Sequence, residues 1–301
     1  MAGKAVEVDV EGRRLRLTNL DKVLYPAVGF TKGQVIDYYT RVAPYVLPHL
    51  HGRALTLKRY PNGVDGGHFY EKQRPSHAPD WVRSVPVVAG DRTIDFVICD
   101  DLPTLVWLAN LADLELHPSL ALAEDVGRPT VVAFDLDPGE PAGLEQCCTV
   151  ALLLRYTLAA LGLECSSKTS GSKGMQVYLP LNAETTYEET KPFAHAIAQL
   201  LENREGGLIV SVMRKSARGG KVFIDWSQND RHKTTVGAYS LRARERPTVS
   251  TPLRWQEVEE VAGGGDPAAL VFDSSQALER LETGSDPFTD VLTLNQRLPD
   301  L

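Results

Sequence analysis

Residues 131–139 read Val131-Val132-Ala133-Phe134-Asp135-Leu136-Asp137-Pro138-Gly139 and give the strongest structural signal in the chain. An apolar run leads into two aspartates separated by one leucine, as in a buried strand that ends in carboxylates. Side chains alternate across a strand, so Asp135 and Asp137 share one face and Leu136 points to the other. Pro138-Gly139 then turns the chain.

The two aspartates predict a metal site. Neighbouring carboxylates repel each other, and each costs free energy to remove from water. A hard divalent cation would neutralise both, which explains their placement at a strand end. The alternative is a solvent-facing strand end, where Asp137-Pro138 simply starts a turn.

A third carboxylate fits the same site. In Lys221-Val222-Phe223-Ile224-Asp225-Trp226, alternation places Asp225 on the face opposite Val222 and Ile224. Three carboxylates from neighbouring strands would hold two divalent ions, an arrangement that catalyses in-line phosphoryl transfer. Taken alone, Asp225 is more simply explained by a salt bridge to Lys221 or Arg218.

Two weaker signals involve residues that could bind an anion or titrate. Thr169-Ser170-Gly171-Ser172-Lys173-Gly174 lies between two predicted strands, and its small residues would let backbone N–H groups face an anion beside Lys173. The spacing is not that of a P-loop, and a plain turn is the alternative. His117 follows an apolar stretch, where a lone histidine is usually structural.

Composition limits the class of protein. The chain has 301 residues, a net charge of -7 and 43% hydrophobic residues, which is ordinary globular composition. Four cysteines without zinc-ligand spacing favour a reduced cytosolic protein. We find no signal peptide and no membrane span, and therefore expect a cytoplasmic protein without a membrane partner.

Charge is unevenly distributed along the acidic chain. Residues 210–247 hold nine basic and three acidic residues, whereas residues 248–301 hold ten acidic and three basic ones. The basic segment is consistent with a phosphate-binding surface. A solvated hairpin beside an acidic tail explains it equally well.

The pattern of elements predicts an α+β fold with antiparallel or mixed sheets. Helices are expected at 34–47, 101–116, 143–162, 186–204, 253–261 and 274–282, and strands at 54–60, 92–99, 130–138, 175–181, 208–212 and 221–226. Thr31 should cap the first helix, and Pro44 should bend or end it. No convincing linker occurs, so we expect one domain over residues 1–301.

Together these segments resemble the polymerase domain of bacterial ligase D, in the archaeo-eukaryotic primase superfamily. Motifs matching in order and spacing are Asn19-Leu20-Asp21-Lys22-Val23-Leu24-Tyr25-Pro26, Lys58-Arg59-Tyr60-Pro61-Asn62-Gly63-Val64-Asp65, Phe69-Tyr70-Glu71-Lys72-Gln73, Leu114-Glu115-Leu116-His117, residues 134–139, residues 169–174, Asp225-Trp226-Ser227-Gln228-Asn229 and Tyr239-Ser240-Leu241-Arg242. The resemblance covers nearly the whole chain and implies a primase-type catalytic core. It also implies a template-dependent nucleotidyltransferase that adds nucleotides to a primer 3′-OH at DNA gaps or broken ends, as in non-homologous end joining.

The resemblance also implies site residues. Asp135, Asp137 and Asp225 would be catalytic and bind two Mn²⁺ or Mg²⁺ ions. The incoming NTP or dNTP would contact Lys58, His117, Ser170, Lys173, Gln228 and Arg242. Lys22 and Lys32 would hold the 5′-phosphate of the downstream DNA strand, and Phe69 and Tyr70 would stack on the template. The family often has two phenylalanines there, so Tyr70 is a mild departure.

Partners and limits follow from the same resemblance. Ku and a separate DNA ligase are implied as partners, a location in the bacterial cytosol or nucleoid is expected, and monomer is the default. No Lys-x-Asp-Gly ligase motif occurs, so we do not expect nick sealing, and Met1 favours a free-standing relative. A non-catalytic DNA-end clamp that recruits a ligase and a metal-dependent phosphohydrolase are the alternatives. The sugar preference, gap length and primer-independent initiation stay open.

Overall fold

The contacts of the chain group into two compact units. The computed structural model describes residues 5–89 and 92–299. Unit 1 contains Met1–Ser119, Val236–Val249 and Asp273–Gly284, and unit 2 contains Leu120–Thr235, Ser250–Phe272 and Ser285–Leu301. Each unit is therefore built from three separate segments. The prediction of a single domain over residues 1–301 stays a prediction.

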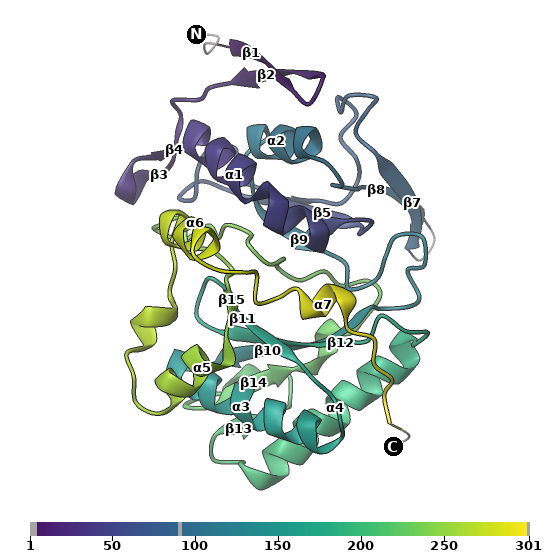
Figure 1. Cartoon of the computed structure of the whole chain (residues 1–301), viewed down its shortest axis with the longest axis vertical. Helices are drawn as coiled ribbons and strands as arrows, with labels where there is room; N and C mark the ends of the chain where they lie inside the picture. Colours follow the sequence, from purple (N-terminus) through teal and green to yellow (C-terminus); the bar gives the residue numbers. More distant parts are fainter. Residues whose placement is uncertain (1–4, 90–91, 300–301) are drawn as a thin grey trace. The chain divides into compact units, whose positions relative to one another are not determined.

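Unit 1 contains a five-stranded antiparallel sheet (Figure 1). Its order is β6-β5-β8-β7, and β9 also pairs with β5. These strands are β5 (Leu55–Arg59), β6 (Phe69–Glu71), β7 (Ser84–Ala89), β8 (Arg92–Val97) and β9 (Asp113–Pro118). Two small antiparallel pairs precede them in the chain: β1 (Ala5–Val10) with β2 (Arg13–Thr18), and β3 (Val23–Tyr25) with β4 (Phe30–Thr31).

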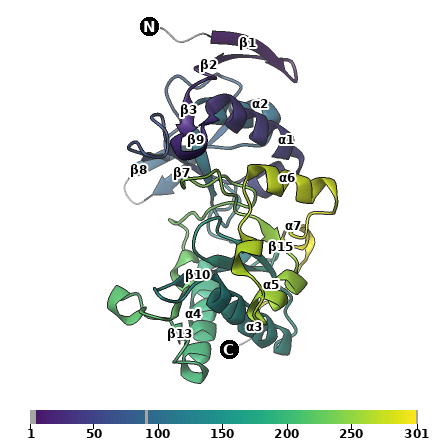
Figure 2. The ribbon, with the colours of Figure 1, turned by 90° about the vertical axis from the view of Figure 1, so that its left-hand side faces the viewer.

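Three α-helices belong to unit 1. They are α1 (Lys32–Leu50), α2 (Leu102–Asn110) and α6 (Ser274–Glu282), and α1 packs against both others (Figure 2). Thr31 caps α1 as predicted, because its hydroxyl accepts from Gln34 N while Gln34 Oε1 accepts from Thr31 N. Pro44 does not end the helix, which continues to Leu50.

The helix predicted over residues 101–116 is wrong in its second half. α2 ends at Asn110, and Ala112 has a φ of 58°, which breaks the helical path. Residues from Asp113 onward form β9 instead. The apolar residues Leu114 and Leu116 alternate there with polar ones, which is the two-residue period of a strand.

Unit 2 contains a six-stranded mixed sheet of order β13-β14-β10-β12-β11-β15. The strands are β10 (Val131–Pro138), β11 (Ser166–Thr169), β12 (Met175–Pro180), β13 (Ile209–Val210), β14 (Val222–Asp225) and β15 (Pro252–Leu253). Neighbouring strands are antiparallel except β13 and β14, which run parallel. The strands expected at 208–212 and 221–226 are therefore both present, as β13 and β14. Because they run parallel, they do not form a hairpin.

The helices of unit 2 are α3 (Leu144–Ala160), α4 (Tyr187–Arg204), α5 (Trp255–Ala262) and α7 (Asp290–Thr293). Short 3₁₀ turns also occur in the two units: η1 (Pro26–Val28), η2 (Lys215–Ala217), η3 (Trp226–Gln228) and η4 (Pro267–Leu270). Helices α3 and α4 pack on the six-stranded sheet, and Phe134, Leu136 and Ile224 point into the apolar core shared with them. Burying each such side chain contributes about 1.5–3 kcal/mol. The side chains that alternate with these, including Asp135 and Asp225, therefore lie on the opposite face of the sheet.

Both units mix helices with antiparallel or mixed sheets, which confirms the predicted α+β class. Among the described residues, no helix combines the length and apolar character needed to span a bilayer.

Candidate active site

The three aspartates lie on one face of the unit 2 sheet. Asp135 of β10 stands directly opposite Asp225 of β14, and Asp137 follows two residues along β10. Because directly paired residues share a face and alternate residues return to it, all three side chains leave the sheet on the side away from Phe134 and Leu136. This confirms the predicted placement of Asp225.

A polar row continues across the same face. Gln176 of β12 is paired with Asp135, and Lys168 of β11 is paired with Gln176. Gln176 Nε2 donates to Asp135 Oδ1 at 3.1 Å, and the fully buried Lys168 donates to Ser250 Oγ at 2.7 Å. The row therefore places an acidic end and a basic end on one sheet surface.

The environment of Asp135 shifts its pKa. Burial, together with the negative charges of Asp137 and Asp225, raises its pKa to about 7, although Gln176 and Lys168 act in the opposite direction. Carboxylates crowded in this way are stabilised by a bound cation, which removes their mutual repulsion. Oxygen donors from three aspartates are also the ligand type that Mg²⁺ and Mn²⁺ prefer. By donor type, the three carboxylates therefore suit the implied metal.

Protein donors hold the carboxylates in this structure. Asp225 Oδ1 accepts from Ser227 N at 3.0 Å and from Ser227 Oγ at 2.5 Å, and its Oδ2 accepts from Gln228 Nε2 at 2.9 Å. Asp137 lies 3.8 Å from Arg218 Nη1. Within residues 5–89 and 92–299, no three His, Cys, Asp or Glu side chains are gathered closely enough to hold a metal ion. Strand register thus puts the three acids on one face of the sheet, but among the described residues they are not gathered into a group that could hold a metal ion.

Asp225 bonds to Ser227 and Gln228 rather than forming the salt bridge to Lys221 or Arg218 that was considered for it. Lys221 Nζ donates to Gly206 O at 2.5 Å, and Arg218 Nη2 donates to Met213 O at 2.9 Å. Gln228, a predicted nucleotide contact, instead bonds to Asp225 directly.

The segment 170–174 is a tight turn between β11 and β12. Ser170 Oγ accepts from Ser172 N at 3.3 Å and from Gly174 N at 3.2 Å, so the turn is closed by its own hydroxyl. Gly174 lies so close to β10 that an added Cβ would stand 2.0 Å from Leu136 O. Lys173 is exposed and pairs with Glu140 at 3.0 Å. The turn keeps Lys173 at the surface of unit 2, and an anion-binding role stays a prediction.

Unit 1 gathers the other three predicted nucleotide contacts. Lys58 of β5, His117 of β9 and Arg242 all contact one carboxylate, that of Glu115, whose side chain is 2% exposed. The shortest distances to its oxygens are 3.1 Å from Lys58 Nζ, 3.1 Å from His117 Nε2 and 3.3 Å from Arg242 Nε. Burial opposes ionisation of Glu115, but His117, Arg242 and Lys58 outweigh it and lower the pKa of the carboxyl.

Glu115 was not predicted as a site residue. A signal was available in the alternation of Leu114-Glu115-Leu116-His117, which places Glu115 and His117 on one face of a strand. Assigning these residues to a helix concealed that signal.

Lys22 and Lys32 lie close together in unit 1. The Lys32 backbone N–H donates to Lys22 O at 2.8 Å. Lys22 Nζ donates to Pro61 O at 2.5 Å, whereas Lys32 Nζ donates to Thr18 O at 2.7 Å. Burial, with the charges of Lys22 and Arg59, lowers the pKa of Lys32 to about 8. Because the charge of Lys22 acts on Lys32, an anion beside the two ammonium groups would be favoured.

Phe69 and Tyr70 are consecutive residues of β6, 42% and 58% exposed. The Arg59 guanidinium lies 5.1 Å from the centre of the Phe69 ring, and Lys58 Nζ lies 5.6 Å from that of Tyr70. Exposed aromatic rings beside cations are suited to stacking on nucleic-acid bases.

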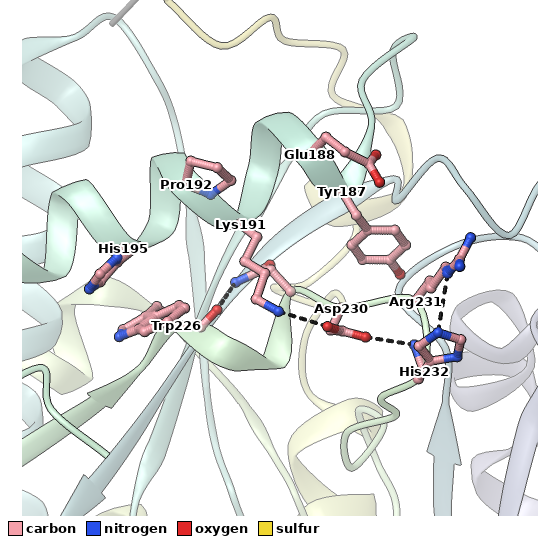
Figure 3. A pocket seen from close by; sticks show the side chains of 10 residues that line it. Tyr187, Glu188, Lys191, Pro192, His195, Trp226, Asp230, Arg231 and His232 are labelled. Atoms are coloured by element: carbon pink, nitrogen blue, oxygen red, sulfur yellow. Dashed lines mark hydrogen bonds and ion pairs between the residues drawn. The ribbon is translucent and has the colours of Figure 1, made fainter. Parts of the chain in front are cut away.

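Unit 2 also contains a cavity of about 460 Å³ beside the start of α4 (Figure 3). His195 stacks on Trp226 at 3.9 Å between ring centres, and Lys191 Nζ bonds Asp230 Oδ2 at 2.7 Å. No predicted site residue lines this cavity; its lining residues are Tyr187, Glu188, Lys191, Pro192, His195, Trp226, Asn229, Asp230, Arg231 and His232.

Comparison with known families places the chain in a nucleotidyltransferase class, for which a mixed sheet with an acidic face is suited. The model of the LigD primase-polymerase domain matches residues 31–288, and the chain belongs to that family.

Known relatives match nearly the whole chain. The multifunctional non-homologous end joining protein LigD of Mycolicibacterium smegmatis is 40% identical over 298 residues, covering 95% of this chain and 38% of the relative. The Mycobacterium tuberculosis H37Rv LigD DNA repair protein is 40% identical over 300 residues, covering 96% and 39%. The chain thus spans about two fifths of the length of these curated relatives.

A solved structure shares the fold. The polymerase domain from Mycobacterium tuberculosis ligase D, in complex with DNA, matches with a TM-score of 0.87 and 39% sequence identity. The match covers 94% of this chain and 99% of that domain. The predicted resemblance is therefore confirmed.

Proposed function

We propose that this chain is a metal-dependent, template-directed polymerase that adds ribo- or deoxyribonucleotides to a primer 3′-OH at DNA gaps or broken ends. The observation that carries the proposal is the row of Asp135, Asp137 and Asp225 on one face of a buried sheet. Non-homologous end joining or short-gap filling is the proposed pathway, because the relatives of this family are named for end joining.

Asp135, Asp137 and Asp225 would hold two divalent ions, Mn²⁺ or Mg²⁺. When bound, such ions activate the attacking hydroxyl and neutralise charge on the triphosphate. Gln176 and Ser227 orient the acids through their hydrogen bonds to Asp135 and Asp225. The rigid, core-packed strands keep these carboxylates in place.

The cationic side chains supply triphosphate recognition. In unit 2, Lys173 offers N–H donors to phosphate oxygens, and Ser170 and Gln228 offer further polar contacts. Within unit 1, Lys58 and Arg242 offer N–H donors beside His117. Charge-assisted hydrogen bonds of this kind are about twice as strong as neutral ones.

DNA would be held at Lys22, Lys32, Phe69 and Tyr70. The lysines would bind a 5′-phosphate on the downstream strand, and the exposed rings would stack on template bases without requiring a sequence. The solved relative in complex with DNA supports DNA as the partner. Ku, a separate ligase, monomeric state and a place in the bacterial cytosol or nucleoid belong to the same proposal.

The test is single-nucleotide gap filling with Mn²⁺ and labelled UTP or dTTP, on a duplex with or without the 5′-phosphate. Wild type should extend the primer, and faster on the phosphorylated duplex. Asp135→Ala and Asp137→Ala should reduce extension at least about 100-fold while gapped DNA still binds.

The same assay separates the alternatives. Extension by both variants at the wild-type rate would refute the site. Tight, phosphate-dependent DNA binding by a wild type that never extends a primer would instead identify the non-catalytic end clamp. Release of free phosphate without extension would identify a phosphohydrolase.

A further inference from the structure

We propose that Glu115 is a positioning residue that holds the nucleotide-binding cations of unit 1 in one fixed cluster. The inference rests on the proposed function, because it assumes that Lys58, His117 and Arg242 contact the incoming nucleotide.

The contacts of Glu115 are unusually numerous for one carboxylate. Oε1 accepts from Tyr60 OH at 3.2 Å and from Ala243 N at 3.1 Å, and Lys58 Nζ lies 3.1 Å from both oxygens. His117 and Arg242 approach Oε2. One buried acid therefore links β5, β9 and the segment 242–243.

The charges in the cluster do not cancel. Lys58 and Arg242 are cationic beside a single buried carboxylate, so the cluster keeps an excess of positive charge. Removing the carboxylate would leave like charges close together, and they would separate. Side chains held in position beforehand lose less freedom on binding, which favours nucleotide affinity.

Glu115 also determines the form of His117. An ionised carboxylate only accepts hydrogen bonds, so a neutral His117 bonded to it carries its proton on Nε2. The Nδ1 atom then remains an acceptor. Burial lowers the pKa of His117, Arg242 and Lys58 act in the same direction, and Glu115 opposes them. The ring edge of Tyr70 is also near, at 6.2 Å between ring centres.

Glu115→Gln removes the charge while keeping the shape, and Asp113→Asn is the matched control. Asp113 lies two residues away on β9, is also fully buried, and accepts from the Lys58 backbone N–H at 2.7 Å rather than from its ammonium. Burial raises the pKa of Asp113, whereas its neighbours lower the pKa of Glu115, so the two buried acids of β9 differ in environment.

The experiment measures the KM for nucleotide in gap filling and the His117 tautomer and pKa by nitrogen-15 NMR, on the full chain. In Glu115→Gln we expect the KM to rise at least about tenfold, the His117 pKa to fall, and the preference for Nε2–H to weaken. Asp113→Asn should leave all three near wild type. Glu115→Asp keeps the charge on a shorter side chain and should give an intermediate KM, which decides the matter if Glu115→Gln does not fold.

Two results would overturn the inference. If His117→Ala and Arg242→Ala raise the KM but Glu115→Gln stays within about twofold of wild type, Glu115 has no positioning role and the proposed function stands. If none of these variants changes the KM, while Lys173→Ala and Asp135→Ala abolish extension, then the nucleotide assignment in unit 1 is itself wrong.

Discussion

The contact proposed between Lys32 and a DNA 5′-phosphate should depend on pH. Its pKa is lowered to about 8, so the ammonium is charged below pH 8 and neutral above it. A 5′-terminal phosphate remains a dianion through this range. The favourable interaction should therefore be complete at pH 7 and should be lost as the pH rises through 8.

We expect the ratio of gapped-DNA affinities with and without a 5′-phosphate to fall several-fold between pH 7 and pH 9. Fluorescence anisotropy at constant ionic strength measures both affinities. Lys32→Met should lower the ratio at pH 7 and make it independent of pH. A ratio in wild type that stays constant from pH 7 to pH 9 would show that Lys32 does not bind the phosphate.

At the residue scale, the sequence reveals acids at the end of an apolar strand better than an acid whose partners are distant in the chain. Asp135 and Asp137 are visible because an apolar strand leads directly into them, and Asp225 because alternation places it away from the core. Glu115 depends on contacts with Lys58 and Arg242, which lie far from it in the chain. No local pattern reports such contacts.

At the element scale, the turn between β11 and β12 is defined by its contact with β10. Gly174 has no room for a side chain, since an added Cβ would meet Leu136 O at 2.0 Å. Gly174→Ala must therefore displace either the turn or the strand that carries Asp135 and Asp137. We expect a loss of about 3 kcal/mol in the free energy of unfolding, with reduced gap filling.

Denaturant unfolding measures this loss. Gly207→Ala is the control, because nothing lies within 4 Å of the Cβ added there. Equal stability of Gly174→Ala and Gly207→Ala would show that the turn is not packed against β10.

Helices and strands with a clear hydrophobic period or capping residue are predicted well from the sequence. Element ends that depend on the backbone conformation of one residue are not. The capped start of α1 and the strand at Val131–Pro138 follow from local chemistry. The end of α2 depends on the left-handed conformation of Ala112. Alanine rarely adopts that conformation, so its presence in the sequence does not predict it. The parallel pairing of β13 and β14 depends on the long basic connection between them, whose path the sequence does not specify.

At the scale of the whole molecule, the distribution of charge matters more than its total. A net charge of -7 argues mildly against a nucleic-acid partner, yet the basic residues are concentrated in 210–247 and near Lys22 and Lys32. Binding through these residues would release counterions from DNA, so affinity should fall as salt increases.

The slope of log affinity against log salt concentration measures the number of phosphate contacts. Lys22→Met should reduce the magnitude of that slope by about 1 on 5′-phosphorylated gapped DNA. Lys72→Met, a change of equal charge on an exposed residue outside the predicted contacts, should alter it less. Identical slopes for wild type and Lys22→Met would exclude Lys22 from the DNA interface.

The most direct test is the rate of single-nucleotide gap filling by Asp225→Asn, with Asp230→Asn as its control. Asparagine can still accept the hydrogen bonds from Ser227 that cap the turn after β14, but it lacks the charge a metal requires. Asp230 lies five residues further along and pairs with Lys191. We predict at least about a 100-fold loss of rate for Asp225→Asn, with DNA affinity retained, and a rate near wild type for Asp230→Asn. Extension by Asp225→Asn at the wild-type rate would contradict the assignment of the three aspartates to one metal-binding active site.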